Sequence, residues 1–544
     1  MKKFLSLVLA LALALSVCSS ALAAGDTVRW GVYSAPKGWF NSALYTDMYD
    51  YYVLQLTQNT LIELDEESSE LAFKGKLAKS YEVSEDGTEI TFYLRDDVNW
   101  HDGEKFTADD VVWFYTAMVD GKVNASHASY FLPLKGAQDY FDGKADSVAG
   151  IEKIDDYTVK FSYDEPFAPA LTYFAAIPVM AKHIWENIPG EDWFSAEALR
   201  TPVGTGPYKF VEYVQDQYVT LTANEDYFEG APKIKNFVYR VVNEDTAQIE
   251  LKNGDLDVVS MISTLKDDDL KLYTDNGLDL LEFADAGYQL MNINNRDEKY
   301  ADVRVRQALA YAINRQGIVD NLIDGHGLVV NAPMIASSWA YPQPEENILN
   351  PYEYNPEKAK ELLAEAGWVD TDNDGIVDKD GVPFKTSLIY PTGNKVRENS
   401  APIIKQCLAQ VGIDCELESM DFNSLSGRMV KGCDFELGLI GLSIEADPDV
   451  FNYYHSSQAD LGNFNFSRYE NPELDALIEL SRVQMDPAER KATFYEINTI
   501  LNRDVTTLWL YSMNEVRAYS PKLLNYKVGN FWEFPDVNLW EFAE

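Results

Sequence analysis

Cysteine is scarce in this chain of 544 residues, which contains four, and histidine occurs only five times. Three of the cysteines follow the N-terminal segment: Cys407, Cys415 and Cys433. Their spacing fits no common metal site, although an oxidising compartment would allow one disulfide among them. The histidines form no H-E-x-x-H motif, and the chain contains no G-x-S-x-G element. The sequence therefore carries neither a zinc-hydrolase nor a serine-hydrolase signature.

Basic residues are also few, because 45 Lys and Arg oppose 88 Asp and Glu, for a formal net charge of −43. Such a surface repels nucleic acid and anionic lipid, so neither is an expected partner. The acidity is expected to keep the protein soluble, and it tolerates cationic or zwitterionic ligands better than polyanions. After the N-terminal segment no apolar run is long enough for a membrane helix, so we expect no direct membrane insertion.

Residues 1–23 have the form of a secretory signal peptide. Two lysines precede an apolar stretch at residues 4–17, and the A-L-A at residues 21–23 fits a cleavage site. A lipoprotein cut before Cys18 is the alternative, but Val17 stands where such a site needs a small residue. We therefore expect export to the periplasm or the outer face of the cell membrane, with a lipid anchor at Cys18 disfavoured.

The most informative stretch is residues 77–118, LAKSYEVSEDGTEITFYLRDDVNWHDGEKFTADDVVWFYTAM. Apolar residues alternate from Ile90 to Leu94, which predicts a half-buried strand. Thr107 stands three residues before Asp110, a capping-box pattern that predicts the start of a helix. Taken alone, this is an ordinary hairpin and helix of an α/β domain. The ordered words LA-x-SYEVS-x-DG and WHDGE-x-x-TA-x-DVV nevertheless resemble the signature of the family 5 extracellular solute-binding proteins, the dipeptide and oligopeptide receptors of ABC importers.

Two further blocks resemble the same family. TPVGTGPYKFVEY, from residue 201, looks like its return to the first lobe, and we expect Gly204 and Gly206 to form a tight turn at positive φ. This loop lacks the spacing of a phosphate-binding motif. Residues 290–315 look like the crossover into the second lobe, and the arginines of the expected helix are assigned to a solvated face. An alternating segment at 151–163 is expected to add a strand to the signature unit.

At 544 residues, two or three packed units are expected. The resemblance implies an α/β, type II periplasmic-binding-protein fold: two lobes with mixed sheets flanked by helices, and an extra subdomain in the first lobe. The division it implies is a first lobe of residues 24–68, 200–287 and 508–544, an extra subdomain at 69–199, and a second lobe at 288–507.

Three helices are expected to begin at a cap residue followed by proline, at Asn355-Pro356, Asn471-Pro472 and Asp486-Pro487. The loop DTDNDGIVDKDG at 370–381 places aspartates at positions 1, 3, 5 and 9 of an EF-hand-like loop, but Gly381 replaces the bidentate Glu of position 12. An acidic hairpin turn is preferred to a calcium site, and no metal is expected.

The block at 437–471 is where the resemblance implies the ligand cleft. Peptide receptors of the family carry an aspartate here that binds the α-amino group of the peptide, because a buried ammonium needs a carboxylate partner. Ile444 occupies the matching position in this chain. Glu445 or Asp447 could supply the carboxylate instead, and Ser443 is a neighbouring candidate.

Aromatic residues are the other candidates for the cleft walls. The resemblance places Tyr33 in the loop after the first strand, Tyr453 in the cleft block, and Trp509 and Tyr511 where the chain returns to the first lobe. Each of these has packing in the core as its alternative.

These features predict a binding protein that is not an enzyme and needs no cofactor. The expected function is that of an extracytoplasmic receptor that closes its lobes on short peptides by a hinge motion. The resemblance implies an ABC transporter permease as its partner, and we expect a monomer. Oligosaccharides, favoured by the abundant aromatics, and metal chelates or other small solutes are alternative ligands. A secreted hydrolase is the alternative from another class, since paired carboxylates could support glycoside hydrolysis.

Overall fold

The computed structural model describes residues 26–66, 68, 71–262 and 265–543. The expected signal peptide, Cys18 included, lies outside these residues. Within them, no helix combines the length and apolar composition needed to cross a bilayer. The three described cysteines, Cys407, Cys415 and Cys433, are free thiols.

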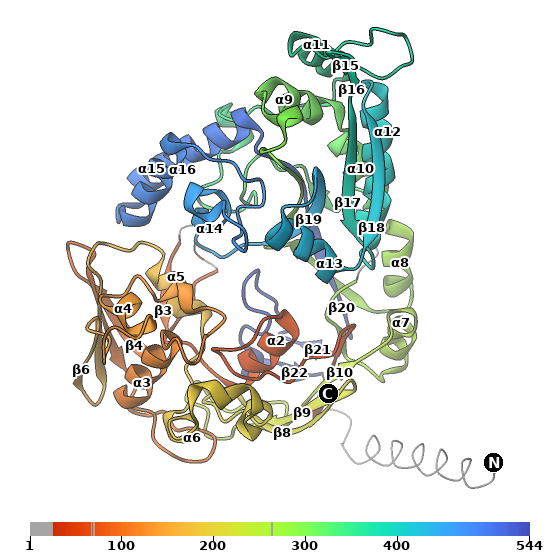
Figure 1. The fold of residues 1–544 in the computed structure, drawn as a ribbon. Coiled ribbons are helices and arrows are strands. Elements are labelled where there is room, and N and C mark those ends of the chain that lie inside the picture. The colour runs from red at the N-terminus through yellow and green to blue at the C-terminus, as the bar shows by residue number, and fades with distance from the viewer. Residues whose placement is uncertain (1–25, 67, 69–70, 263–264, 544) are drawn as a thin grey trace, which may run out of the picture.

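The fold is mixed α/β and is built on a sheet of 12 strands (Figure 1). Ten of them follow the order β18-β17-β19-β13-β20-β11-β1-β10-β9-β8, while β12 and β14 pair with β20. The bounds are β1 Thr27–Val32, β8 Tyr208–Val214, β9 Tyr218–Ala223, β10 Asn236–Val241, β11 Val258–Val259, β12 Asp279–Ala284, β13 Gly287–Ile293, β14 Gly327–Leu328, β17 Lys385–Pro391, β18 Asp414–Met420, β19 Leu437–Ser443 and β20 Thr507–Tyr519.

The long strand β20 joins the two halves of this sheet. Its residues 507–511 pair antiparallel with β13, and residues 514–519 pair antiparallel with β12. The last two residues of that strand, 518 and 519, also pair with β11, which lies beside β1. Within the described residues, only β20 and the short link between β12 and β13 therefore carry the chain across the middle of the sheet. The expected boundary at 508 falls inside β20.

A separate sheet of four strands, in the order β4-β5-β7-β6, forms the unit that contains the signature stretch. Its strands are β4 Ala78–Val83, β5 Glu89–Leu94, β6 Ile151–Asp155 and β7 Thr158–Ser162. The predicted strand at 90–94 is confirmed, whereas the segment 151–163 is a hairpin of two strands. The helix α3 (Ala108–Met118) begins as predicted, because the Asp110 carboxylate accepts the Thr107 N–H at 3.0 Å.

Helices cover both halves of the large sheet and the smaller unit (Figure 1). Their bounds are α2 Met48–Thr57, α4 Ala137–Phe141, α5 Ala170–Ala176, α6 Lys182–Trp185, α7 Glu244–Asn253, α8 Asp267–Asp275, α9 Val303–Ala312, α10 Arg315–Leu322, α11 Pro356–Glu365, α12 Lys395–Gln410, α13 Phe422–Ser426, α14 Phe451–Tyr454, α15 Pro472–Val483 and α16 Pro487–Asp504. Short two-stranded pairs complete the fold: β2 Ile62–Leu64 with β3 Phe73–Gly75, β15 Asp378–Lys379 with β16 Val382–Pro383, and β21 Leu523–Leu524 with β22 Glu541–Phe542.

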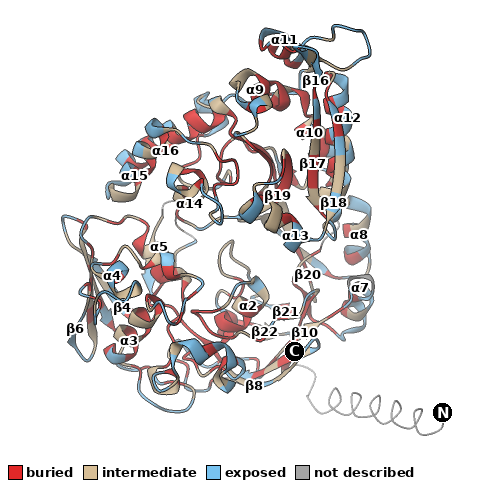
Figure 2. Cartoon of the chain, in the orientation of Figure 1, coloured by how far each residue is buried: buried red, intermediate tan, exposed pale blue. Residues whose placement is uncertain are grey.

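The three predicted cap-and-proline helix starts are confirmed at α11, α15 and α16. Asn355, Asn471 and Asp486 each accept backbone N–H groups of the first helical turn through their side chains. Figure 2 shows that buried residues follow the strands, while the outer faces of helices such as α11 and α15 are exposed.

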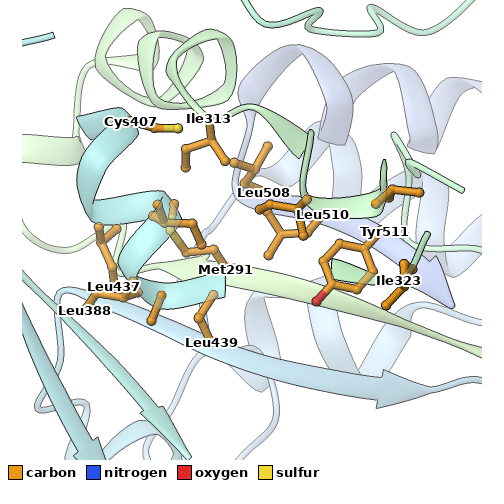
Figure 3. Close-up of a cluster of buried hydrophobic side chains, with 14 of the residues drawn as sticks. Met291, Ile313, Ile323, Leu388, Cys407, Leu437, Leu439, Leu508, Leu510 and Tyr511 are labelled. Atoms are coloured by element: carbon orange, nitrogen blue, oxygen red, sulfur yellow. The ribbon is translucent and has the colours of Figure 1, made fainter. Parts of the chain in front are cut away.

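The largest core lies where the helices pack on β13, β17, β19 and β20. Figure 3 shows Met291, Leu439 and Leu508 from neighbouring strands facing Ile313 and Cys407. All five side chains are 5% exposed or less. This apolar layer fixes the position of the strand ends that carry the candidate site.

Two arginines of the crossover segment do not lie on a solvated face as expected, whereas the side chains of Arg296 and Arg304 are 47% and 43% exposed. Arg306 and Arg315 are 5% and 4% exposed. Arg306 donates to the backbone oxygens of Tyr300 and Asp504, and Arg315 donates to those of Val330 and Trp509. Guanidinium groups have five fixed donors, so each one satisfies several buried carbonyls that no helix or strand uses.

Glycine is needed at positions 204 and 206 for a different reason from the one expected. Neither residue has positive φ. Both lie against the backbone of Thr57, so closely that a Cβ at either position would overlap its carbonyl group. Glycine is required here because two backbone segments touch.

The carboxylates of the Asp-rich loop bond to its own backbone and also lie close to one another. Asp370, Asp372 and Asp374 could bring carboxylate oxygens within 4.8 Å of one another. These oxygens accept backbone N–H groups of the loop itself, such as Asn373 N to Asp370 Oδ1 at 2.7 Å. Hydrogen bonds of this kind, in which an Asp side chain accepts a backbone N–H two or three residues on (Asx turns), stabilise a hairpin.

His326, which directly precedes β14, bonds to side chains of β12 and α8. Its Nδ1 lies 2.8 Å from Glu282 Oε1 and its Nε2 3.1 Å from Asp267 Oδ1. Partial burial lowers the pKa of His326, but the hydrogen bonds to Glu282 and Asp267 outweigh this and hold it above its ordinary value. The protonated imidazole therefore stabilises the fold below pH 6.5, and this contribution is lost as the pH rises through the raised pKa.

We expect His326→Gln to lower the melting temperature more at pH 5.5 than at pH 8.5, by a difference equivalent to about 1 kcal/mol. Thermal unfolding of both proteins across this pH range measures the effect. An equal loss at the two pH values would show that the charge on His326 contributes nothing.

Candidate functional site

A cavity of about 620 Å³ opens between the two halves of the large sheet and the four-stranded unit. It is bounded by α2, by the link between β12 and β13, by residues 443–446 after β19, by β20 and by the loop 526–538. This volume lies within the range of sites that enclose small ligands.

Acidic groups outnumber basic ones among the described residues that line this cavity, nine to four. The acidic residues are Glu63, Asp65, Glu66, Glu229, Asp285, Glu445, Glu515, Glu533 and Asp536, and the basic ones are Lys74, Lys76, Arg517 and Lys527. Several are already paired: Lys76 forms ion pairs with Glu63 and Glu229, and Glu66 accepts the N–H groups of Asn530 and Phe531. Aromatic rings, including Tyr45, Tyr51 and Trp532, supply much of the remaining wall. The cavity therefore favours a ligand that carries positive charge.

Glu445 lies on the first turn after β19 and faces a group of tyrosines. Tyr130 donates its hydroxyl to Glu445 Oε1 at 3.0 Å. Burial raises the pKa values of Tyr45, Tyr51 and Tyr130, and the negative charge of Glu445 raises each of them further. The carboxylate is therefore surrounded by hydroxyl groups and rings contributed by the opposite side of the cavity.

No Lys, Arg or His among the described residues forms an ion pair with Glu445. Solvent reaches its side chain from the cavity, yet the surrounding protein is dense enough that desolvation raises its pKa, with a smaller contribution from the charge of Asp447. A carboxylate in this environment is stabilised by a cation brought by a ligand.

A second group of charged residues lies on β20 and beside β12, at the same cavity. Arg517 donates to both carboxylate oxygens of Glu533, at 3.1 and 3.0 Å, and its Nη2 lies 2.5 Å from Glu515 Oε2. Desolvation and the charge of Glu515 raise the pKa of Asp285 to about 7, against the opposing charge of Arg517.

Two of the seven predicted ligand residues line the cavity: Ser443 and Glu445. Asp447 does not, because its carboxylate is 3% exposed and forms a bidentate pair with Arg490, with Nη1–Oδ2 at 2.5 Å and Nη2–Oδ1 at 2.8 Å. Of the two carboxylates that could replace the family's aspartate, the structure leaves only Glu445 facing the cavity.

The four predicted aromatic residues lie outside the lining of the cavity. Trp509 and Tyr511 are 3% and 1% exposed, and Trp509 Nε1 donates to the Tyr454 hydroxyl at 3.1 Å. Figure 3 shows Tyr511 within the hydrophobic core. Tyr33 and Tyr453 are half-buried and pack against hydrophobic clusters. For Trp509 and Tyr511, the core alternative is the one that the structure adopts.

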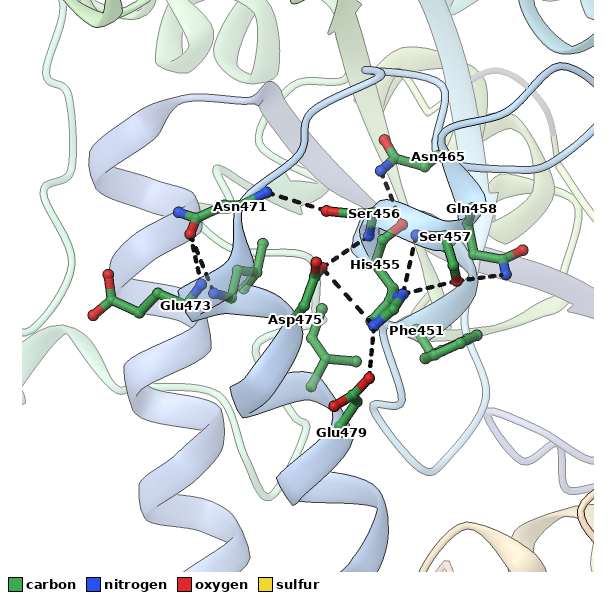
Figure 4. A network of polar contacts seen from close by, with 12 residues as sticks. Phe451, His455, Ser456, Ser457, Gln458, Asn465, Asn471, Glu473, Asp475 and Glu479 are labelled. Atoms are coloured by element: carbon green, nitrogen blue, oxygen red, sulfur yellow. Dashed lines mark hydrogen bonds and ion pairs between the residues drawn. The ribbon is translucent and has the colours of Figure 1, made fainter.

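A polar network surrounds His455, ten residues after Glu445 (Figure 4). Ser456 N donates to Asp475 Oδ1 at 2.8 Å, and Asn471 N donates to the Ser456 hydroxyl at 3.2 Å. His455 Nδ1 lies 2.8 Å from the Ser457 hydroxyl. These contacts join the H-S-S segment, residues 455–457, to the start of α15 and hold the two in a fixed arrangement.

The four-stranded unit also contacts α14 and α15 directly. Ala168 N donates to the Arg482 carbonyl at 2.8 Å. The Arg482 guanidinium lies over the rings of Phe167 and Phe451, at 5.0 and 4.3 Å, and its Nε lies 3.1 Å from Asp449 Oδ2. Together with the bond between Tyr130 and Glu445, these contacts close one side of the cavity.

Several lining residues were missed by the sequence analysis. Asp285, Glu515 and Arg517 carry no motif, and they meet because β12 pairs with β20. Tyr45 precedes α2 and Tyr51 lies on it, in a stretch where no ligand residue was predicted. The clustering of these tyrosines with acidic residues was the one feature of the sequence that could have indicated a binding site.

Comparisons with known proteins agree on one family. The profile of the bacterial extracellular solute-binding proteins, family 5, matches residues 72–463. The chain is 31% identical over 564 residues to the oligopeptide-binding protein AppA of Bacillus subtilis, covering 99% of this chain and 98% of that protein. It is 27% identical over 519 residues to heme-binding protein A of Haemophilus influenzae, covering 92% and 90%.

Solved structures give the same result. The structure of AppA from Bacillus subtilis with a nonapeptide matches with a TM-score of 0.79 at 30% identity, covering 96% of this chain and 99% of that one. NikZ from Campylobacter jejuni in complex with Ni(L-His) matches with a TM-score of 0.80 at 27% identity, covering 95% and 100%.

Proposed function

Because the chain belongs to the bacterial extracellular solute-binding proteins of family 5, the non-enzymatic binding components of ABC transporters, we propose that it captures short peptides. The cavity of about 620 Å³ holds the peptide, and Glu445 binds its α-amino group. The receptor is exported, acts as a monomer and delivers its ligand to an ABC permease.

The observation that carries this proposal is Glu445 itself. Its carboxylate faces the cavity, accepts one hydroxyl from Tyr130 and has no cationic partner among the described residues. An ammonium group would supply the missing charge and could donate to the second carboxylate oxygen. The neighbouring Ser443 offers a hydroxyl to the same end of the ligand.

Relatives of this chain bind other solutes, and the residues that line this cavity can be compared with what those solutes need. Its described lining includes no histidine and no cysteine, the residues that most often ligate nickel or heme iron. The abundance of acidic side chains instead suits a ligand with a free amino group. Oligosaccharides remain the second candidate, because Trp532 and several tyrosines could stack on sugar rings.

Native mass spectrometry of the mature protein, as purified and before any ligand is added, tests the proposal. We expect a set of bound masses that sequence as peptides. Masses that differ by hexose units would identify a sugar receptor, and a single metal-containing mass would identify a chelate receptor; either result would overturn the peptide assignment.

We propose that the lobes move about the link between β12 and β13 and about residues 512–514 of β20. The lobes in this proposal are those expected from the sequence, with 24–68, 200–287 and 508–544 in the first lobe, 69–199 in its subdomain and 288–507 in the second, except that the crossing in β20 lies at 512–514 instead of 508. Hinges of this kind are short segments that absorb backbone rotation while the packed units stay rigid.

Arg482 then acts as a latch for the closed form. We expect Arg482→Ala to weaken binding of a tetrapeptide by about tenfold, because losing its contact with Phe167, which lies on the other side of the lobe boundary, favours opening by about 1.4 kcal/mol. Calorimetry measures the affinity, and small-angle scattering measures the radius of gyration. Arg428→Ala is the matched control, since Arg428 pairs with Glu418 within the same lobe, at 2.7 Å. Unchanged affinity in Arg482→Ala would refute the latch.

A further inference from the structure

The hinge side of the cavity holds a group of charges that the binding of an α-amino group leaves unused. Asp285 lies on the link between β12 and β13, and Glu515 lies on β20, where it pairs in register with Phe283. Both side chains are half-buried and line the cavity. Their carboxyl groups lie against one another, and the charge of Glu515 contributes to the raised pKa of Asp285.

Arg517 does not neutralise this pair. Its Nε and Nη2 are bound to Glu533, and Nη2 also contacts Glu515. One guanidinium is thus shared among three carboxyl groups, those of Asp285, Glu515 and Glu533. The group therefore keeps an excess of negative charge at the wall of the cavity.

Arg517 also has an unused donor. The residue is 2% exposed, lines the cavity and has no hydrogen-bond partner for Nη1 among the described residues. A buried donor without a partner is costly, so this nitrogen indicates that an acceptor atom is brought by a ligand. The cluster thus offers two features together: carboxylates without a full counter-charge, and a donor without an acceptor.

We propose that Asp285 and Glu515 form a second cation subsite, which receives the ammonium or guanidinium group of a basic side chain of the bound peptide. Arg517 Nη1 donates to a main-chain carbonyl of the same peptide. This inference rests on the proposed function and specifies its substrate class: the receptor selects peptides that carry Lys or Arg.

The strand register defines the position of that side chain in the peptide. Gly287 pairs with Ser443, and Ile444 N donates to Ala286 O at 2.8 Å. Asp285 and Glu445 therefore lie opposite each other, just beyond the paired ends of β13 and β19. Neighbouring strands lie about 5 Å apart. If Glu445 binds the α-amino group, the basic side chain that reaches Asp285 belongs to the first or second residue of the peptide.

Competition between three tetrapeptides tests this assignment. The probes are Lys-Ala-Ala-Ala, the same peptide with norleucine in place of lysine, and Ala-Ala-Ala-Lys, with affinities measured by calorimetry at pH 8. We expect the first peptide to bind at least tenfold more tightly than the other two. In Asp285→Asn this preference should fall to less than twofold, while binding of the norleucine peptide is retained and shows that the variant is folded.

Asp279→Asn is the matched control, because Asp279 is also an aspartate and begins strand β12, directly after which Asp285 lies, but it is exposed and does not line the cavity. It should keep the full preference. Equal affinity for the lysine and norleucine peptides, or an unchanged preference in Asp285→Asn, would overturn the subsite while peptide binding itself stands. If none of the three peptides binds, the proposed function fails and the subsite with it.

The pH dependence gives an independent readout. The charged and titratable groups that face the pair are Arg517, Glu533 and the hydroxyls of Tyr49 and Tyr52. Since the pKa of Asp285 is raised to about 7, a cation must displace a proton at pH 6 but not at pH 8. The preference for lysine should therefore be smaller at pH 6, by up to about tenfold. A preference that does not change with pH would contradict a role for Asp285.

Discussion

Replacing Glu445 by Gln is expected to weaken binding of a short peptide at least 100-fold. The substitution keeps the size of the side chain and an oxygen that can accept the Tyr130 hydroxyl, but it removes the charge that pairs with the α-amino group. Loss of one partner from a desolvated charge pair costs about 2–5 kcal/mol. Titration calorimetry with a tetrapeptide measures the change directly.

A chemically modified ligand provides the control for this variant. Acetylation of the peptide N-terminus removes the ammonium group, so the acetylated peptide should bind the unaltered protein as weakly as the free peptide binds Glu445→Gln. The two changes together should cost little more than either one alone, because they remove the same interaction. If Glu445→Gln binds the free peptide as tightly as the unaltered protein does, the amine anchor lies elsewhere.

The second large effect is expected on stability. Replacing Arg490 by Met leaves the Asp447 carboxylate buried without its bidentate partner. Removal of one member of a buried ion pair costs about 3–5 kcal/mol. For a unit of the size of the second lobe this corresponds to a fall in melting temperature of the order of 10 °C, measurable by calorimetry.

Arg296→Met is the matched control. Arg296 pairs with Glu470 at 2.8 Å, but these side chains are 47% and 57% exposed, and pairs of this kind contribute less than about 1 kcal/mol. The melting temperature of this variant should therefore change little. Equal losses in the two variants would show that the Asp447–Arg490 pair has no special role in stability, and would reopen a ligand role for Asp447.

Asp447 and Glu445 illustrate what a sequence can and cannot decide. Both are carboxylates within three positions of the place where the family has its amine-binding aspartate, and no local pattern separates them. The structure separates them because α16 carries Arg490, 43 positions along the chain, to Asp447. Ion pairs between distant segments have no local sequence signal, so only the packing of α16 assigns Asp447 to the interior.

The arginines of the crossover segment show the same limit. The sequence predicted a helix in this segment, and α9 indeed begins after Asp302, whose side chain accepts the Arg304 N–H. Periodicity cannot show that unpaired carbonyls of distant loops surround Arg306 and Arg315. Charged residues are exposed in most proteins, so exposure was the reasonable expectation, and it was wrong for these two residues.

The sequence by itself determined the family, the mixed α/β fold and the starts of the helices. These depend on ordered words of adjacent residues, on alternation within single strands, and on cap residues that bond to their own helix. The tertiary structure alone decided which side chains face the cavity. Glu445, Asp285, Glu515 and Arg517 come together because β19, β12, β13 and β20 pair across long separations in the chain. Long-range strand pairing places residues side by side that share no local pattern, and for this reason it could not be read from the order of the residues.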